Sequence, residues 1–524
     1  MTGAFALSDE EIYDSYQDAV KSGNQENMNK RYGVGILAYW AGILVVKVLH
    51  HFFCLWFPKS WMRFQNTTPI RRLRSATGTH PAVTPKVGVV FVFIILAIVF
   101  SFIQLSVWYP SATNNYLDAA TFGRALGNRV GMMSLYLLPL LILFAGRNNF
   151  LLWITGLSQD TFVFFHRWIA RVMVLLLLAH GIAESIARAS RGIYSEMFGI
   201  PFWSYGIVGL SFAMFIFVQG MRFIRGRAYD LFIVLHIVAV IIFLAAGYWH
   251  LKDFTTGLSK FFYACFAVWG ADRLARLLRV LYSSRIIGRP ALIELEHRTL
   301  VITFDHPWPV TAGQFVYIHF LVGHVWWQSH PFTLVPSSQE PGKLKIYVRI
   351  HRGITKRLSD LVLKKNEVDA YVKEGLEEKD SYKIETKVLL DGPYGHSYNF
   401  AAYEELVFVA GGTGITSPHA YIRQYLDKKI TLFWAVGTSH EKWFDEELES
   451  LAEFKHIEVH VIFTKEQKLN IPEVLGTRLE QINGPTAVLC CGPTSMNNDT
   501  RATVASLVPK VPHYLQFYAE SFSL

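Results

Sequence analysis

Two apolar stretches decide the fold of this chain: residues 162–188, FVFFHRWIARVMVLLLLAHGIAESIAR, and residues 230–251, DLFIVLHIVAVIIFLAAGYWHL. The first contains His166 and His180 and the second contains His236 and His250, so that each holds two histidines fourteen residues apart. In a helix this spacing falls about 40° short of four full turns and covers about 21 Å along the axis. Both rings of each helix therefore lie on one face.

Two helices with the same histidine spacing can hold two stacked haems, each bound by one histidine from each helix. Neutral imidazole is a suitable ligand because its second nitrogen can be oriented by a hydrogen bond. The alternative is that these histidines are ordinary polar residues inside a helix bundle. Ionisable residues within a membrane are costly and usually functional, and the duplicated spacing favours the haem interpretation.

The composition indicates a membrane protein with further domains. The chain has 524 residues, enough for two or three domains, and is 52% hydrophobic and 15% aromatic, with the apolar excess before about residue 282. The net charge of +9 does not indicate nucleic-acid binding, because most basic residues flank apolar segments. The four cysteines form no disulfide framework or zinc spacing. Residues 1–29 are polar and acidic, so we expect no cleavable signal peptide.

A polar N-terminal tail, 1–32, precedes a polytopic α-helical membrane domain predicted over residues 33–282. Basic clusters in 58–86, after the fifth span and after the seventh place these segments in the cytosol. The fourth and sixth spans then both run outward, so His166 pairs with His236 near the cytosol and His180 with His250 near the outer face. The seven predicted spans are 33–57, 87–109, 131–155, 162–188, 203–223, 230–251 and 258–281.

Residues 288–398 are expected to form an antiparallel β-barrel, because short alternating runs are separated there by glycine and proline. Three motifs stand out in this region: His330-Pro331-Phe332-Thr333, His351-Arg352-Gly353-Ile354-Thr355 and Asp391-Gly392-Pro393-Tyr394-Gly395.

Residues 403–524 predict an α/β domain. The apolar run 406–410 leads into Gly411-Gly412-Thr413-Gly414-Ile415-Thr416 and then a helix, whose N-terminal N–H groups suit a phosphate. The glycines alone are weak evidence, since any tight strand-to-helix turn favours them. Cys491-Gly492-Pro493 ends a later strand at the carboxyl edge, where open α/β sheets bind ligands.

Together these residues resemble the ferric reductase transmembrane family, which includes fungal ferric and cupric reductases and the NADPH oxidases. The resemblance extends from about residue 87 to the end of the chain, with the motifs in the family's order. Gly146-Arg147-Asn148-Asn149-Phe150 and Phe165-His166-Arg167-Trp168 are more similar to fungal metalloreductases than to oxidases. The first span is then an addition to a six-helix haem core, and the cytosolic half resembles a ferredoxin-reductase-like module.

The resemblance implies roles for individual residues. His330, Pro331, Phe332 and Thr333 would hold the flavin of FAD, and Arg349, Gly353 and Thr355 its pyrophosphate, with Gly395 nearby. Gly411, Gly412, Thr413, Gly414, Ile415 and Thr416 would cradle the pyrophosphate of NADPH. Cys491, Gly492 and Pro493 would lie by the nicotinamide, and Phe522 would stack on the isoalloxazine, although a simple core aromatic is the alternative for Phe522. Cys491 and Phe522 are the predicted catalytic residues.

The implied activity is electron transfer from cytosolic NADPH through FAD and two b-type haems to extracytoplasmic Fe(III) or Cu(II) chelates. The alternatives are an oxidase that reduces dioxygen to superoxide and a catalytically silent membrane scaffold. The preference for NADPH over NADH rests on the resemblance. We expect an integral protein of the plasma membrane, with the vacuolar and endoplasmic reticulum membranes as alternatives; a metal-permease or regulatory partner is left open. Four arginines are expected to make the outer loops cationic: Arg124, Arg129, Arg188 and Arg191.

Overall fold

The computed structural model describes residues 9–79, 119–227, 229–254, 257–286, 288–296, 299–306, 308–321, 328–351, 353–372, 382–395, 397–437, 443–465 and 469–520. The chain divides into two compact units, Met1–His50 with Val90–Leu274, and His51–Val89 with Ala275–Leu524. The predicted span 87–109 and the predicted catalytic residue Phe522 lie outside the described residues.

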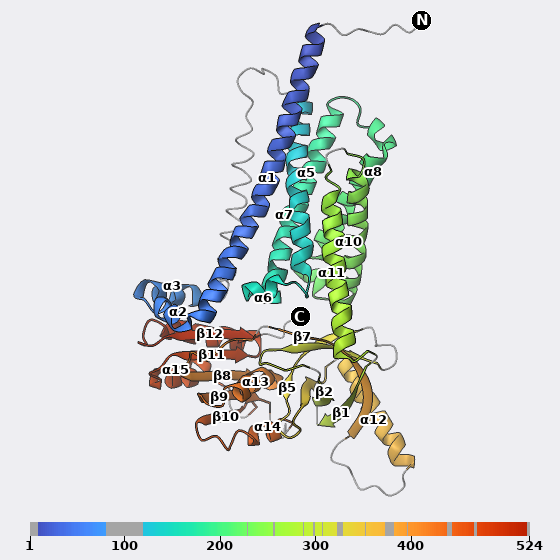
Figure 1. The fold of residues 1–524 in the computed structure, drawn as a ribbon. Coiled ribbons are helices and arrows are strands. Elements are labelled where there is room, and N and C mark those ends of the chain that lie inside the picture. Colours follow the sequence, from blue (N-terminus) through green and yellow to red (C-terminus); the bar gives the residue numbers. More distant parts are fainter. Residues whose placement is uncertain are drawn as a thin grey trace. The chain divides into compact units, whose positions relative to one another are not determined.

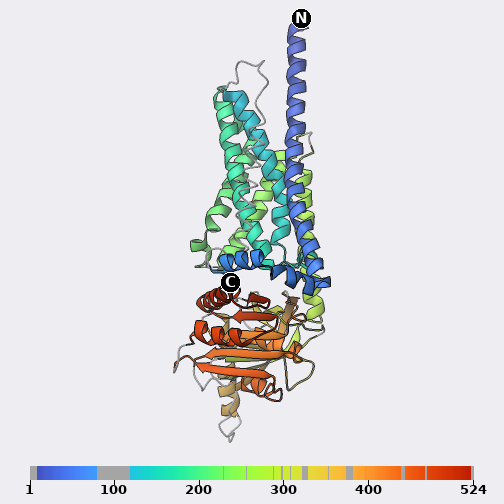
Figure 2. The ribbon, with the colours of Figure 1, turned by 90° about the vertical axis from the view of Figure 1, so that its left-hand side faces the viewer.

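The first unit is a bundle of long helices that run alongside one another (Figures 1 and 2). Five helices of the described residues are long and apolar enough to cross a membrane: Glu26–Trp56, Phe122–Ala145, Gln159–Ala189, Pro201–Gln219 and Leu231–Leu251. Its helices are α1 (Asp9–Trp56), α5 (Ala119–Ala145), α6 (Leu151–Thr155), α7 (Gln159–Ala189), η1 (Glu196–Gly199), α8 (Pro201–Gln219), α9 (Arg222–Arg225), α10 (Tyr229–Leu251) and α11 (Lys260–Ser283), of which α1 and α11 continue into the second unit.

Two predicted spans differ from the structure. The first span, 33–57, is helical as predicted and lies within α1, which begins at Asp9 in the predicted tail and ends at Trp56. The predicted span 131–155 is broken: α5 ends at Ala145, and the Asn149 amide donates to the Leu143 carbonyl at 3.1 Å in the turn that follows. The predicted span 258–281 is helical, as α11, but is not among the five apolar helices, since it carries Asp272 and several arginines.

The Gly146–Phe150 motif is held by α11 within the first unit. The carboxylate of Asp272 accepts hydrogen bonds from the backbone N–H of Asn148 at 2.9 Å and from the Asn148 amide at 3.3 Å. Asp272 therefore fixes the turn that separates α5 from α6.

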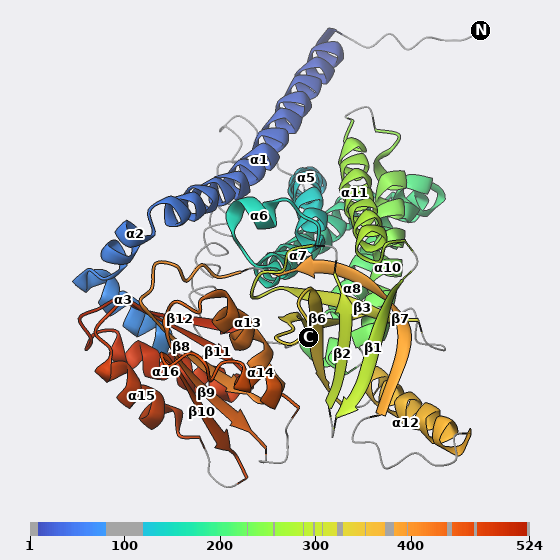
Figure 3. The ribbon, with the colours of Figure 1, turned by 60° about the horizontal axis from the view of Figure 1, so that its bottom comes forward.

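A seven-stranded antiparallel sheet in the second unit curves around its own core, as predicted for residues 288–398 (Figure 3). Its strand order is β4-β3-β7-β1-β2-β6-β5, and the cross-strand neighbours Ile293, Ile302 and Ile346 on β1, β2 and β6 are buried. The elements are β1 (Arg289–Glu296), β2 (Thr299–Asp305), β3 (Phe315–Phe320), β4 (His330–Thr333), β5 (Val335–Pro336), β6 (Lys343–Arg349), α12 (Ile354–Val372) and β7 (Tyr382–Tyr394).

A five-stranded sheet forms the rest of the second unit, with order β10-β9-β8-β11-β12 and every pair parallel. This confirms the predicted α/β domain. Its elements are β8 (Glu405–Gly411), η3 (Gly412–Ile415), α13 (Thr416–Gln424), β9 (Lys429–Val436), α14 (Asp445–Glu449), β10 (Ile457–Phe463), α15 (Ile471–Gln481), β11 (Thr486–Cys491), α16 (Thr494–Leu507) and β12 (Leu515–Glu520). Two helices from early in the chain, α2 (Pro58–Gln65) and α3 (Thr68–Thr79), also belong to this unit.

Candidate functional site

The four histidines of α7 and α10 face one another in two pairs. The ring centroids of His166 and His236 are 6.4 Å apart, and those of His180 and His250 are 6.3 Å apart. A metal–imidazole bond is about 2 Å long and a coordinating nitrogen lies roughly 1 Å from its ring centre, so two rings that share one metal need centroids roughly 6 Å apart. Both pairs therefore have a separation that two nitrogen ligands of one metal would need, and His166 faces His236 and His180 faces His250 as predicted from the spacing and the span directions.

Backbone carbonyls orient three of these rings. The Nδ1 atoms of His166, His180 and His250 lie 2.9, 2.8 and 2.7 Å from the carbonyl oxygens of Leu141, Gly127 and Phe202. Because a carbonyl only accepts, each Nδ1 carries the proton and donates it, which leaves the Nε2 lone pair available as a ligand.

The fourth histidine has no such partner. The Nδ1 atom of His236 is buried and lacks a hydrogen-bond partner among the described residues. That ring is held by packing, with its centroid 5.3 Å from that of Phe232, one turn earlier on α10.

Three glycines on α5, Gly123, Gly127 and Gly131, allow the face of α7 that carries His180 to pack closely against it. A Cβ on Gly123 would lie 2.8 Å from the Ala183 carbonyl, and one on Gly131 would lie 2.8 Å from Nδ1 of His180. On α8, a Cβ on Gly206 would similarly lie 2.9 Å from the His250 ring. Sequence reasoning missed these glycines, although small residues at four-residue spacing on an apolar helix are a recognised sign of close helix packing.

Two of the four arginines predicted to face outward in the loops are engaged inside the first unit. Arg129 is buried on α5, where its Nε donates to the Asn29 side chain at 3.1 Å, so its predicted loop position is wrong. Arg188 pairs with Glu184 one turn earlier on α7, with 3.4 Å between nitrogen and oxygen. Arg124 is exposed but lies on α5 rather than in the predicted loop, and Arg191 is exposed just after the end of α7.

The predicted flavin residues lie on adjacent parts of the antiparallel sheet. The His330–Thr333 motif is strand β4, which pairs with β3 so that Thr333 opposes Phe315. Arg349 ends β6 and is exposed, and Gly353 follows with a φ of 88° just before α12 begins. Thr355 closes this turn, because its hydroxyl accepts from the His351 backbone N–H at 2.9 Å.

Gly395 and the motif before it lie close to the same region. Gly395 has a φ of 112°, and a Cβ there would lie 2.4 Å from the Gly313 carbonyl, so only glycine fits. The preceding Asp391 is fully buried and accepts from the Tyr394 hydroxyl at 2.6 Å and from Nε of Arg276 at 2.8 Å. The loop is therefore anchored by the C-terminal part of α11.

The predicted phosphate turn has the expected strand–turn–helix form. Strand β8 ends at Gly411, residues Gly412–Ile415 form a tight 3-10 turn, and α13 begins at Thr416, whose hydroxyl donates to the Thr413 carbonyl at 3.0 Å. Gly412 has a positive φ of 54°, and a Cβ on it would lie 4.0 Å from the Arg349 guanidinium. Arg349 is thus brought to the edge of the phosphate turn.

The two glycine-containing motifs of the parallel sheet are in direct contact. A Cβ on Gly414 would lie 2.3 Å from the Cys491 carbonyl, and one on Gly411 would lie 3.0 Å from the Pro493 ring. Gly492 follows Cys491 at the end of β11, so this edge brings residues 411–416 and 491–493 together. Both motifs end neighbouring parallel strands, so they lie together at the carboxyl edge of the sheet, where open α/β sheets bind ligands.

Glu520 lies next to these two motifs, and sequence reasoning assigned it no role of its own. It lies opposite Cys491 in the β11–β12 pairing and accepts hydrogen bonds from the hydroxyls of Ser417 and Tyr421, the latter at 3.3 Å. Burial raises the pKa of Glu520, and burial together with the Glu520 charge raises the pKa of the Cys491 thiol. Cys491 is therefore a protonated thiol at neutral pH, beside a carboxyl held by α13.

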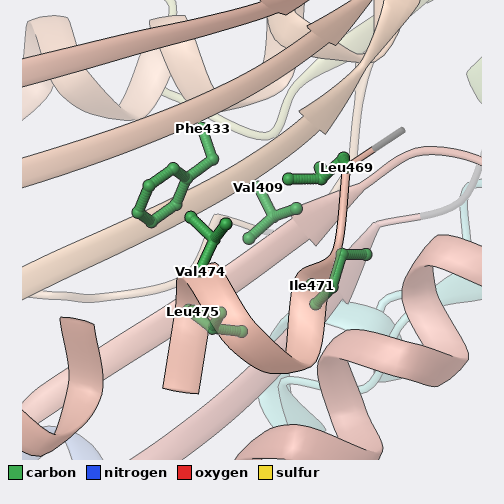
Figure 4. Close-up of a pocket in the computed structure, with 6 residues that line it drawn as sticks. All are labelled: Val409, Phe433, Leu469, Ile471, Val474 and Leu475. Atoms are coloured by element: carbon green, nitrogen blue, oxygen red, sulfur yellow. The ribbon is translucent and has the colours of Figure 1, made fainter. Parts of the chain in front are cut away.

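A pocket in the parallel domain is core packing. Six apolar side chains line it, as Figure 4 shows: Val409, Phe433, Leu469, Ile471, Val474 and Leu475. With no polar group in its lining, it offers nothing to orient a nucleotide. The described residues contain no group of three or more His, Cys, Asp or Glu side chains that could hold a metal by themselves.

Known protein families match three consecutive parts of the chain. Residues 130–247 match "Ferric reductase like transmembrane component", residues 294–398 match "FAD-binding domain" and residues 408–502 match "Oxidoreductase NAD-binding domain". A helical membrane unit joined to these two nucleotide-binding domains defines a membrane-bound oxidoreductase that uses FAD and a nicotinamide nucleotide.

Similar proteins narrow this class. A probable ferric reductase transmembrane component of Candida albicans is 31% identical over 85% of this chain and 68% of its own length. The ferric/cupric reductase transmembrane component 1 of the same species is 32% identical over 85% of this chain and 60% of its own length. This chain belongs to the ferric reductase family. Among solved structures, a flavohemoglobin from Malassezia yamatoensis is 14% identical over 78% of this chain and 99% of its own, with a TM-score of 0.37.

Proposed function

We propose that this chain is a transmembrane ferric- and cupric-chelate reductase. It takes electrons from cytosolic NADPH, uses FAD and two b-type haems as carriers, and delivers electrons to Fe(III) or Cu(II) chelates on the other side of the membrane. The observation that carries this proposal is the pair of facing histidines at two levels of α7 and α10, with centroids 6.4 and 6.3 Å apart. A soluble reductase would have no use for two such sites inside an apolar bundle.

The histidine pairs fit haem better than a bare metal ion. Each pair offers two opposed nitrogens and no third protein ligand in the described residues, which is what a metal with four macrocyclic nitrogens requires. His166 and His236 would hold the haem nearer the cytosol, and His180 and His250 the outer one. When bound, haem supplies single-electron chemistry and flavin links it to the two-electron chemistry of nicotinamide.

The residues of the second unit would bind and orient the two nucleotides. His330, Pro331, Phe332 and Thr333 on β4 would hold the flavin, while Arg349, Gly353, Thr355 and Gly395 would surround its pyrophosphate. Residues Gly411 to Thr416 would bind the NADPH pyrophosphate through backbone N–H groups at the start of α13. Cys491, Gly492 and Pro493 would line the nicotinamide site, and the terminal Phe522 would cover the flavin.

A metal chelate is the better-supported acceptor. The curated relatives described above are named ferric or ferric/cupric reductases, and the Gly146–Phe150 turn is more similar to metalloreductases than to oxidases. Arg124 and Arg191 are the exposed cations at the ends of α5 and α7 that would attract an anionic ferric chelate, and salt would weaken this attraction. We propose the plasma membrane as the site of action, with the nucleotide-binding domains in the cytosol.

The test is turnover of the purified full chain with NADPH and ferric citrate, with and without oxygen and superoxide dismutase. We expect reduction under anaerobic conditions and almost no effect of dismutase in air. Ferric reduction that requires oxygen and disappears with dismutase would instead identify an oxidase. Reduction by NADH at the same efficiency would overturn only the preference for NADPH. That preference rests on the resemblance, since no arginine at the end of β9 marks a 2′-phosphate site.

A further inference from the structure

Helix α3 lies between α1 and α5 in the chain and makes side-chain contacts with the parallel domain, residues 403–524. Arg71 Nη2 lies 2.8 Å from the Val508 carbonyl oxygen, and Arg71 also donates to the Val511 carbonyl. The Ser75 hydroxyl donates to the Ala505 carbonyl at 3.0 Å. Figure 3 shows α3 beside α16 within the second unit.

The Arg71 contacts lie where a helix needs a cation. The last carbonyls of a helix have no partner within it and carry the negative end of the helix dipole, so an arginine there is stabilising. Val508 is the C-cap residue of α16, which ends at Leu507, and Val511 follows it. Arg71 therefore caps α16 at Val508, and Ser75 binds the Ala505 carbonyl in the last turn, both from outside the domain defined by residues 403–524.

Arg74 covers the open edge of the parallel sheet. Strand β12 is the last in the sheet order, and the Tyr514 carbonyl accepts from the Thr486 backbone N–H on β11 at 2.8 Å. Because successive carbonyls of a strand alternate in direction, the Leu515 carbonyl points to the open edge, where Arg74 donates to it. Arg74 also lies 2.9 Å from the Gln516 side-chain oxygen, and its guanidinium lies 4.7 Å from the Tyr514 ring centroid.

Strand β12, which Arg74 binds at Leu515, runs to the proposed nicotinamide site at Cys491. Strand β12 ends at Glu520, which lies opposite Cys491 and is held by Ser417. A shift of β12 at Leu515 would therefore move Glu520 relative to Cys491. We propose that α3 is a working part of the nucleotide-binding domain, in which Arg71 and Arg74 are positioning residues that keep β12, up to Glu520, in register with the nicotinamide site. This inference rests on the proposed location of that site.

The test uses the full chain with Arg71 and Arg74 both replaced by methionine, compared with R72M. Arg72 is exposed on the same helix, so R72M removes a positive charge from α3 at an exposed position. Hydrogen exchange of residues 505–520 should become about tenfold faster in R71M/R74M and stay unchanged in R72M. The maximal rate of flavin reduction by NADPH, measured without a metal acceptor, should fall roughly tenfold in R71M/R74M.

A positioning role also predicts that the loss appears in the maximal rate of flavin reduction and not in the KM for NADPH. The KM for NADPH should change less than twofold, because the phosphate turn lies on β8, two strands from the edge that α3 covers. Lysine at both positions should recover part of the rate, since it restores the charge and a donor. Equal exchange and equal rates in R71M/R74M and R72M would overturn the inference, as would a loss confined to KM.

Two further comparisons keep the inference testable. If R71M/R74M does not fold, R74M leaves Arg71 in place, and wild-type exchange at residues 515–520 in R74M would contradict the inference. A wild-type protein that reduces its flavin but no ferric chelate would refute the proposed function and leave the role of α3 standing.

Discussion

Lys345 and Glu447 form a buried ion pair between the two domains of the second unit, with 3.3 Å between Nζ and Oε1. Lys345 lies on β6 of the antiparallel sheet and Glu447 on α14 of the parallel domain, and their side chains are 10% and 0% exposed. Glu447 also accepts from the Tyr347 hydroxyl at 3.3 Å and the Ser338 backbone N–H at 3.3 Å. Three donors from one domain thus converge on one carboxylate of the other.

We expect the Lys345–Glu447 pair to fix the relative orientation of the two domains and to add little to the free energy of unfolding. Replacing Lys345 alone with methionine leaves a buried carboxylate without its cation, which should cost about 3–5 kcal/mol of unfolding free energy. The double variant K345M/E447L should recover most of that loss and still reduce its flavin more slowly than wild type. Thermal unfolding and stopped-flow flavin reduction measure the two effects. Flavin reduction at the wild-type rate in K345M/E447L would show that the ion pair does not control the orientation of the domains.

His419 predicts a stability loss in acid. Its ring is fully buried, neither nitrogen has a hydrogen-bond partner among the described residues, and Glu447 lies 3.9 Å away. Burial lowers the pKa of His419 from 6.5 to about 4, against the raising effect of Glu447 and with the lowering effect of Arg423 and Lys345. As pH falls from 6.5 towards 4, His419 binds a proton in the unfolded state but stays neutral in the folded state. Its contribution to the free energy of unfolding therefore decreases across that window and does not change further at lower pH.

The size of this effect is about 3 kcal/mol, the free energy that corresponds to the lowering of the His419 pKa. Unfolding of the full chain between pH 7 and pH 4, followed by flavin release, should therefore be less pH-dependent in H419L than in wild type. Identical pH profiles for the two proteins would show that His419 does not titrate in this range.

Haem ligation is tested by removing one ligand at a time. H180A and H250A should each lose one low-spin haem per chain while retaining flavin and the other haem, because the remaining pair lies on the same two helices at its own level. Haem content by the pyridine haemochrome assay and flavin content measure this. H460A is a control, since His460 is half exposed on β10. Two haems per chain in H180A would refute the assignment.

Gly131 predicts a steric effect on the same site. G131A places a methyl group 2.8 Å from Nδ1 of His180, so the ring must move and the outer haem should be lost or change its absorption spectrum. G199A is the matched control, because a Cβ on Gly199 meets nothing within 4 Å. A normal outer haem in G131A would mean that α5 and α7 separate without cost.

The Asn66 sequon tests the topology. Asn66-Thr67-Thr68 has the glycosylation pattern, and the Asn66 amide donates to the Pro512 carbonyl of the parallel domain at 3.0 Å. If both lie in the cytosol, the protein should not shift on endoglycosidase treatment. A sugar on Asn66 would invert the proposed orientation and exchange the inner and outer haem labels. An added sequon in the outer loop around residue 193 should be modified in the proposed orientation.

Local regularity explains what could be predicted from the sequence. The histidine pairing followed from two local patterns. Equal spacing places the rings at two matching levels on each helix, and the basic clusters predict that both helices run outward. The glycine turn before α13 was predictable for the same reason, since a strand, a positive φ at Gly412 and a helix are neighbours in the chain. Helix limits were less predictable: the turn after Ala145 depends on Asp272, which is 124 residues from Asn148.

Only the tertiary structure decided which side chains meet across long separations. Arg129 lies in a segment that reads as a charged outer loop, yet its partner Asn29 is 100 residues away and draws it into the bundle. Arg71 lies 437 residues from Val508, and nothing in the local pattern distinguishes it from the exposed Arg72. Charge and hydropathy along the chain determine which segments are apolar and which are basic, whereas packing determines which charge is buried, capped or left in water.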